Sequence, residues 1–121
     1  MCMKINNAFD HEITHNVFFN ARKFHVLALK TYYFNFNNNL MVGVTKRLTM
    51  VFEDLIACFA SYEAVSPSTD NITVTKNLCQ GSEGNGFAVP DVGCSDIDIY
   101  PYAGNTAGSC QIGWIFARGE G

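Results

Sequence analysis

Glycine is distributed so unevenly along this chain of 121 residues that its two parts are not expected to share one type of backbone structure. Gly43 is the only glycine before the turn-rich run 65–70, and nine glycines follow that run. Because glycine is costly inside helices, the distribution predicts a helical first half and a second half of short strands and loops. The expected fold class is α+β, a small antiparallel sheet with two helices packed on one face.

The chain is expected to form a single domain over residues 1–121. It would comprise a helix–hairpin–helix half over 1–64 and a loop-rich strand half over 71–121. Each half alone would bury too little surface for independent stability. Hydrophobic residues make up 48 % and charged residues 16 %, which is typical of a globular protein. No internal repeat is recognised.

The first half is predicted to contain two helices around a hairpin. Asp10 is a suitable N-cap for the first helix. After it, apolar residues recur in steps that place them on one helical face: Ile13, Val17, Ala21, Phe24 and Ala28. A strand over 31–36, a turn of three asparagines over 37–39 and a returning strand over 40–44 would follow.

The second helix is expected over about 46–62. Its buried side would consist of Leu48, Phe52, Leu55, Phe59 and Tyr62. Short strands separated by turn residues are then predicted at 72–75, 87–89, 97–100 and 111–116.

The run His11-Glu12-Ile13-Thr14-His15 has the H-E-x-x-H pattern. On a helix, His11 and His15 would lie on one face and could share a zinc ion, with Glu12 as general base. Residues 10–18 resemble the HExxH zincin family, and the resemblance implies a zinc-dependent metallohydrolase or peptidase whose motif helix forms part of the catalytic cleft.

The chain departs from the zincin pattern in three respects. The positions of the metzincin continuation hold Phe18 and Ala21 in place of Gly and His. Two other residues are candidates for the third zinc ligand. His25 would lie roughly 15 Å from His15 along the helix axis, too far to share the ion. Glu53, the best glutamate for a gluzincin-like ligand, would point away from the apolar face of the second helix. In addition, zincins resemble one another in having strands before this helix, whereas almost no chain precedes His11 here. The third zinc ligand is therefore unidentified.

Other residues suggest weaker alternatives. Cys58 is expected to be a small buried thiol in preference to a nucleophile. Residues 80–86 are expected to form a flexible Gly-rich loop, because they lack the Lys-Ser/Thr of a phosphate-binding loop. An acidic strand face is favoured over a weak calcium site at Asp91, Asp96 and Asp98. Trp114 is expected in the core, and Tyr100 and Tyr102 are candidates for a peptide- or sugar-binding surface.

Charge and composition limit the partners and the compartment. The net charge is −3 and no basic patch is present, so no nucleic-acid partner is expected. No apolar run reaches the ~18 residues of a membrane span. The absence of a signal peptide predicts a cytoplasmic protein as written, or an extracellular one if the N-terminus is incomplete. The five cysteines leave at least one thiol outside intrachain disulfides.

Two functions remain open. The leading prediction is a small non-catalytic binding or assembly domain, whose partner is an unknown protein or small ligand. The alternative is a zinc-dependent metallohydrolase that uses His11, His15 and Glu12, with zinc as the possible cofactor. A truncated or misread reading frame is a third interpretation.

Overall fold

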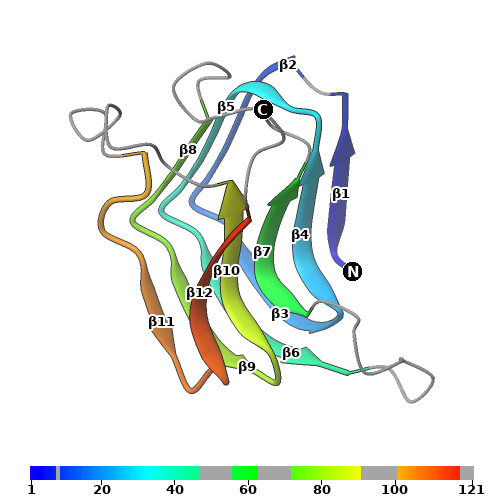
Figure 1. Cartoon of the computed structure of the whole chain (residues 1–121), viewed down its shortest axis with the longest axis vertical. Helices are drawn as coiled ribbons and strands as arrows, with labels where there is room; N and C mark the ends of the chain where they lie inside the picture. Colours follow the sequence, from blue (N-terminus) through cyan, green and yellow to red (C-terminus); the bar gives the residue numbers. More distant parts are fainter. Residues whose placement is uncertain (8, 47–55, 63–71, 91–100, 118–121) are drawn as a thin grey trace.

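The computed structural model describes residues 1–7, 9–46, 56–62, 72–90 and 101–117, and these residues form β-strands and no helix (Figure 1). The strands belong to three sheets, and every strand pair within them is parallel. No described helix is long and apolar enough to cross a membrane.

The three sheets contain different numbers of strands. The five-stranded sheet contains β1 (Met3–Asn6), β4 (Phe24–Leu29), β7 (Ala57–Tyr62), β10 (Asn85–Pro90) and β12 (Ile112–Ala117). The four-stranded sheet contains β11 (Thr106–Gly108), β9 (Leu78–Ser82), β6 (Leu40–Thr45) and β3 (Val17–Arg22). The three-stranded sheet contains β2 (Phe9–Thr14), β5 (Tyr32–Asn37) and β8 (Ile72–Thr75).

Consecutive strands lie in different sheets, so the chain winds as a solenoid. It passes from the five-stranded to the three-stranded and then to the four-stranded sheet before returning to the first, and each circuit stacks on the previous one (Figure 1). This architecture is a parallel β-helix. The first circuit takes 23 residues, since Asn16 contacts Asn39 at that separation. An internal repeat therefore exists, contrary to the sequence analysis.

The predicted α+β fold is wrong. The first predicted helix covers β2, β3 and β4, which lie in three different sheets. Its supposed apolar face is divided, because Ala21 and Ala28 are buried whereas Val17 is 69 % exposed. Three short strands joined at corners reproduced a helical spacing by coincidence, since each corner resets the two-residue alternation of a strand.

The second predicted helix and the hairpin are also wrong. Residues 57–62 form β7, and residues 47–55 lie outside the described part of the chain. The strands over 32–37 and 40–45 exist, but β5 and β6 belong to different sheets and do not pair with each other. Strands from both predicted halves share all three sheets, because β8, β9 and β10 add to strands of the first half.

The core fills the interior of the solenoid with stacked rows of apolar side chains. One row runs across the five-stranded sheet through Met3, Val26, Phe59, Phe87 and Trp114. Opposite it, Phe34 and Phe36 of β5 are fully buried, and the Phe36 ring lies 4.6 Å from the Phe59 ring. Aromatic and β-branched residues suit these positions because they pack well against in-register neighbours on a pleated surface.

The corners between sheets repeat one backbone conformation. Where β2, β5 and β8 of the three-stranded sheet pass to the four-stranded sheet, the first corner residue has a positive φ: 56° at His15, 54° at Asn38 and 55° at Lys76. Gly104, two residues before β11, has a φ of 75°. A left-handed residue turns the chain sharply without interrupting the ladders on either side. The predicted turn at 37–39 is therefore present, although it leads into another sheet.

The second corner residue is an asparagine in each of these circuits. The backbone N–H of Asn16 donates to Oδ1 of Asn39, that of Asn39 to Asn77 and that of Asn77 to Asn105, at 2.9–3.0 Å. The amide groups of Asn39, Asn77 and Asn105 donate in turn to the carbonyls of Ile13, Phe36 and Val74. This asparagine ladder (Asn16, Asn39, Asn77, Asn105) gives the corner N–H groups of Asn16, Asn39 and Asn77 an acceptor and adds a donor to a carbonyl of each preceding strand.

The Gly-rich run 80–86 is not the flexible loop that the sequence predicted. It forms the end of β9, a tight connection and the start of β10. A Cβ atom at Gly84 would approach the Ile56 carbonyl oxygen to 2.7 Å, and one at Gly86 would approach that of Gly113 equally closely. These two glycines allow neighbouring circuits to pack backbone against backbone.

Candidate functional site

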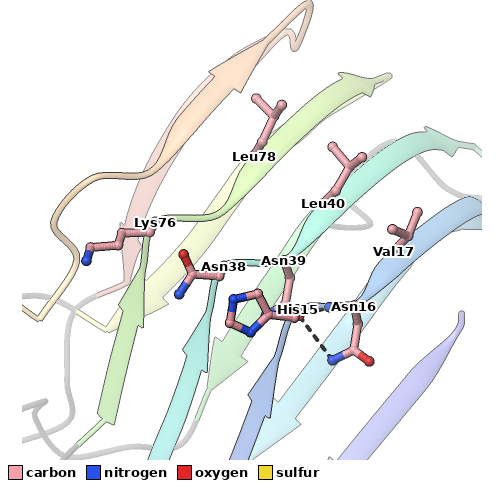
Figure 2. A pocket seen from close by; sticks show the side chains of 8 residues that line it. All are labelled: His15, Asn16, Val17, Asn38, Asn39, Leu40, Lys76 and Leu78. Carbon is pink, nitrogen blue, oxygen red and sulfur yellow. Dashed lines mark hydrogen bonds between the residues drawn. The ribbon is translucent and has the colours of Figure 1, made fainter.

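An open depression lies on the outside of the corner that carries the asparagine ladder (Figure 2). Its volume is about 510 Å³, within the usual range of small-ligand sites. The lining comes from three successive circuits and consists of His15, Asn16, Val17, Asn38, Asn39, Leu40, Lys76 and Leu78. We call this depression the corner groove.

One side of the corner groove is a polar row formed by His15, Asn38 and Lys76. The three residues are in equivalent positions of successive circuits, and all three side chains are exposed. Parallel strands stack about 4.8 Å apart, so the row presents an imidazole, an amide and an ammonium group at regular spacing along the solenoid. A left-handed backbone costs more conformational free energy at His15 and Lys76 than at a glycine. Residues with long side chains are therefore unusual at these two positions.

The other side of the corner groove is an apolar row formed by Val17, Leu40 and Leu78. These residues are in register across β3, β6 and β9. Val17 is 69 % exposed and Leu78 is 39 % exposed, each beside a buried residue of its strand, Phe18 and Cys79. A contiguous apolar row on an outer surface is typical of a binding site.

The corner groove is electrically distinct from the rest of the chain. Its eight lining residues include Lys76 and His15 but no carboxylate, whereas the whole chain has a net charge of −3. A ligand in the groove would therefore meet cationic and amide donors on one side and aliphatic side chains on the other.

The H-E-x-x-H residues lie on β2 and at the following corner, and the zinc hypothesis loses its helical basis. His11 and Glu12 are consecutive strand residues, so their side chains point to opposite faces. His11 is in register with the buried Phe34, and Glu12 with the exposed Asn35. His15 lies beyond the strand, where its Nδ1 is 2.9 Å from the Thr14 hydroxyl.

The metal content of the protein tests the zinc hypothesis directly. Within the described residues, no three or more His, Cys, Asp or Glu side chains form a group that could hold a metal ion. Zinc sites in proteins use three or four such ligands. Because a strand and a left-handed corner replace the helix that would place His11 and His15 on one face, we expect the untagged protein, after exhaustive dialysis, to contain far less than one zinc per chain by mass spectrometry. One zinc per chain that disappears in His15→Ala and persists in Glu12→Gln would restore the metallohydrolase hypothesis.

Cys2 and His25 form a thiol–imidazole pair that the sequence analysis missed. Cys2 Sγ lies 3.5 Å from Nδ1 of His25. Burial lowers the pKa of His25 to about 4, and nearby backbone groups of Val42 and Gly43 offset this only in part. A nucleophilic cysteine needs its partner histidine to accept and hold a proton. A neutral, buried imidazole does not favour that role at neutral pH.

The remaining predicted residues fall into two groups. Tyr102 and Trp114 are half-buried with ring centroids 6.0 Å apart, and Trp114 stacks on Phe87 as a core residue would. Cys58 is buried as expected, but in a disulfide with Cys79. Outside the described residues lie Glu53, Asp91, Cys94, Asp96, Asp98 and Tyr100.

The corner groove was not found from the sequence because its residues are far apart in the chain. One signal was present: a polar residue followed by asparagine occurs at His15-Asn16 and again at Asn38-Asn39, 23 residues later. Periods of this length indicate solenoids. The longer separations of 38 and 28 residues in the next circuits conceal the period.

Known proteins provide no guide to the use of this groove. The chain matches no family model, no curated protein and no solved structure. The function is therefore inferred from the chemistry of the groove alone.

Proposed function

We propose that this chain is a non-catalytic binding domain whose corner groove holds an extended acidic oligosaccharide along the solenoid axis. The observation that carries the proposal is the pair of parallel rows, His15/Asn38/Lys76 and Val17/Leu40/Leu78, on one outer corner. A sugar ring has an apolar C–H face and a rim of hydroxyl groups, and an acidic sugar adds a carboxylate. The two rows match these features side by side.

An extended ligand fits better than a compact one. The rows run across three circuits, so they present polar groups on one side and aliphatic side chains on the other along a line. A ligand with repeating units would make similar contacts at each circuit. Amide groups and an ammonium group hydrogen-bond hydroxyl and carboxylate oxygens, and the bond from a charged donor is the stronger.

A peptide strand is a weaker candidate for the same groove. Peptides commonly bind by adding a strand to a sheet edge, through main-chain hydrogen bonds. At the centre of the groove, β6 is already paired on both sides, with β3 and β9. Recognition there must rely on side chains, which favours a ligand rich in hydroxyl and carboxylate groups.

Binding to a defined panel tests the proposal. Titration calorimetry at low salt would compare oligogalacturonate with neutral dextran oligomers and with polyglutamate. We expect Lys76→Ala to weaken oligogalacturonate binding about tenfold, since a hydrogen bond from a charged donor contributes about 1.5–3 kcal/mol and exposure reduces it. Leu78→Asp should weaken binding further, because it places a carboxylate beside the ligand's own charge.

Lys4→Ala is the matched control, because Lys4 is an exposed lysine on β1 of a different sheet. It should leave affinity unchanged. Equal loss in Lys4→Ala and Lys76→Ala would show nonspecific charge attraction only. No binding to any acidic sugar oligomer would contradict the proposal, and preferential binding of polyglutamate would replace it with acidic-peptide recognition.

A further inference from the structure

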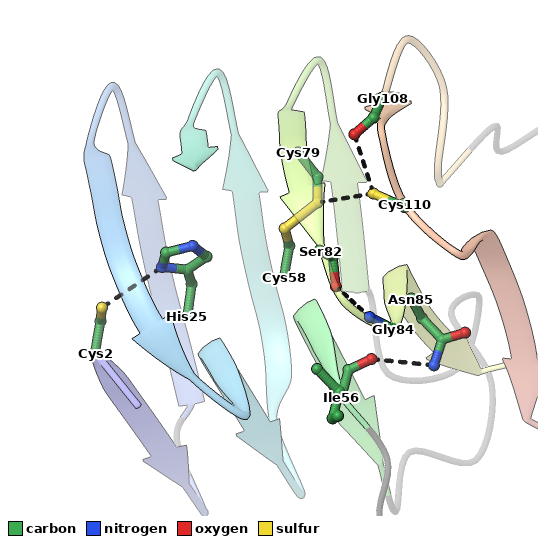
Figure 3. Close-up of a disulfide and its surroundings, with 10 residues drawn as sticks. All are labelled: Cys2, His25, Ile56, Cys58, Cys79, Ser82, Gly84, Asn85, Gly108 and Cys110. Atoms are coloured by element: carbon green, nitrogen blue, oxygen red, sulfur yellow. Dashed lines mark hydrogen bonds between the residues drawn. A yellow bond between two sulfur atoms is a disulfide. The ribbon is translucent and has the colours of Figure 1, made fainter. Parts of the chain in front are cut away.

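Three cysteines meet inside the C-terminal part of the solenoid (Figure 3). Cys58 on β7 and Cys79 on β9 form a disulfide that links the five-stranded sheet to the four-stranded sheet across the interior. Cys110, which follows β11, is a free thiol, and its Sγ lies 3.7 Å from the Sγ of Cys79. A thiol in contact with one sulfur of a disulfide is the arrangement from which thiol–disulfide exchange begins.

We propose that Cys110 exchanges with this disulfide, so that the chain interconverts between a Cys58–Cys79 isomer and a Cys79–Cys110 isomer. The Cys110 thiol loses its proton to solvent, and the thiolate attacks the Sγ of Cys79. A bond forms between the sulfurs of Cys110 and Cys79 as the bond between Cys79 and Cys58 breaks. Cys58 leaves as a thiolate and takes up a proton, so no external oxidant or reductant is needed.

The surroundings of the three sulfurs determine which step is available. Cys58 and Cys79 are completely buried, whereas Cys110 is half-buried and therefore the accessible sulfur of the three. Its contact is with Cys79 and not with Cys58, and Figure 3 shows Cys110 on the side of Cys79 away from Cys58. Attack at Cys79, with Cys58 as the leaving group, is the exchange that this arrangement favours.

The two isomers would restrain different parts of the solenoid. The Cys58–Cys79 bond joins two sheets across the core, between strands of one circuit. A Cys79–Cys110 bond would instead join that circuit to the segment that follows β11. Ala107 of β11 is already in register with Cys79. In the second isomer the last circuit gains a covalent attachment and the β7–β9 cross-link is lost.

Disulfide mapping by mass spectrometry tests the exchange. The protein, with Cys2 and Cys94 replaced by serine, would be held at pH 6, 7 or 8, quenched with acid and N-ethylmaleimide, and digested with pepsin. We expect Cys79–Cys110 peptides and alkylated Cys58 to appear together, at an initial rate that is higher at pH 8 than at pH 6, because the thiolate is the attacking species. The rate should not depend on protein concentration.

Two variants separate exchange from misfolding or intermolecular reaction. Cys58→Ser should form the Cys79–Cys110 bond on mild air oxidation, and Cys110→Ser should show Cys58–Cys79 alone under every condition. The proposal is wrong if, in the protein that retains Cys58, Cys79 and Cys110, Cys110 is still the only alkylated cysteine after prolonged incubation at pH 8. A rate proportional to protein concentration would overturn it equally.

Discussion

Replacing Asn77 by alanine should lower the free energy of unfolding by about 2–5 kcal/mol. Asn77 is 2 % exposed, and its Oδ1 accepts hydrogen bonds from both the backbone N–H and the side-chain amide of Asn39. Its own amide donates to the carbonyl of Phe36 at 2.9 Å and to Asn105. Alanine would leave the buried Asn39 N–H without its acceptor and would remove the Asn77 donor from the Phe36 carbonyl, and an unpaired buried polar group costs about 1–3 kcal/mol.

Urea unfolding followed by circular dichroism would measure this loss, with Asn16→Ala as the matched control. Asn16 is the exposed end of the same asparagine ladder, and its amide donates to Thr14 and Asn39. Water can replace partners at that end, so Asn16→Ala should cost about 1 kcal/mol or less. Equal losses in the two variants would show that burial of the ladder does not determine its contribution.

Individual strands were more predictable from the sequence than the fold. The strands expected at 72–75, 87–89 and 111–116 are present as β8, β10 and β12, apart from small shifts at their ends. The alternation of Tyr32, Phe34 and Phe36 predicts one shared face of this strand, and Phe34 and Phe36 are both buried on it, whereas Tyr32 is 42 % exposed. These features depend on local alternation and on β-branched and aromatic content, which the sequence displays directly.

Parallel pairing between distant circuits is not a local property. A strand whose partner lies 23 or 38 residues away has the same composition as a strand in a hairpin, so the returning strand over 40–44 was assigned to the wrong partner. The H-E-x-x-H pattern misled for a related reason. The helical arrangement of His11 and His15 requires a continuous helix, whereas His15 follows the end of β2 in a left-handed corner.

The corner groove illustrates what a solenoid adds to a sequence. None of His15, Asn38 and Lys76 suggests a site alone, because each is an ordinary polar residue at a turn. The stacking of circuits brings them into one row and brings Val17, Leu40 and Leu78 into another. A binding surface of this kind is specified by register, and register depends on the buried rows of the core.

Acidification from pH 7 to pH 5 should lower the free energy of unfolding by roughly 2 kcal/mol through His25 alone. His25 is fully buried, and burial lowers its pKa from 6.5 to about 4, with a smaller contribution from the N-terminal ammonium group. The unfolded chain takes up a proton at this position as the pH falls through 6.5. The folded chain takes up this proton only near pH 4. The free energy of unfolding therefore decreases as the pH is lowered from 6.5 towards 4.

His25→Leu isolates the contribution of His25, because leucine fills a similar volume and does not titrate. Urea unfolding at pH 7, 6 and 5 should show a smaller pH dependence in His25→Leu than in the unvaried protein, whatever the absolute stability of the variant. His15→Gln, which removes an exposed histidine, is the control substitution. If His25→Leu keeps the same slope, burial does not lower the pKa of His25, and the folded protein protonates this imidazole over the same pH range as the unfolded chain. Cys2, whose Sγ lies 3.5 Å from the His25 ring, would then be beside a cation below that range, and the thiol–imidazole pair would regain a basis for reactivity there.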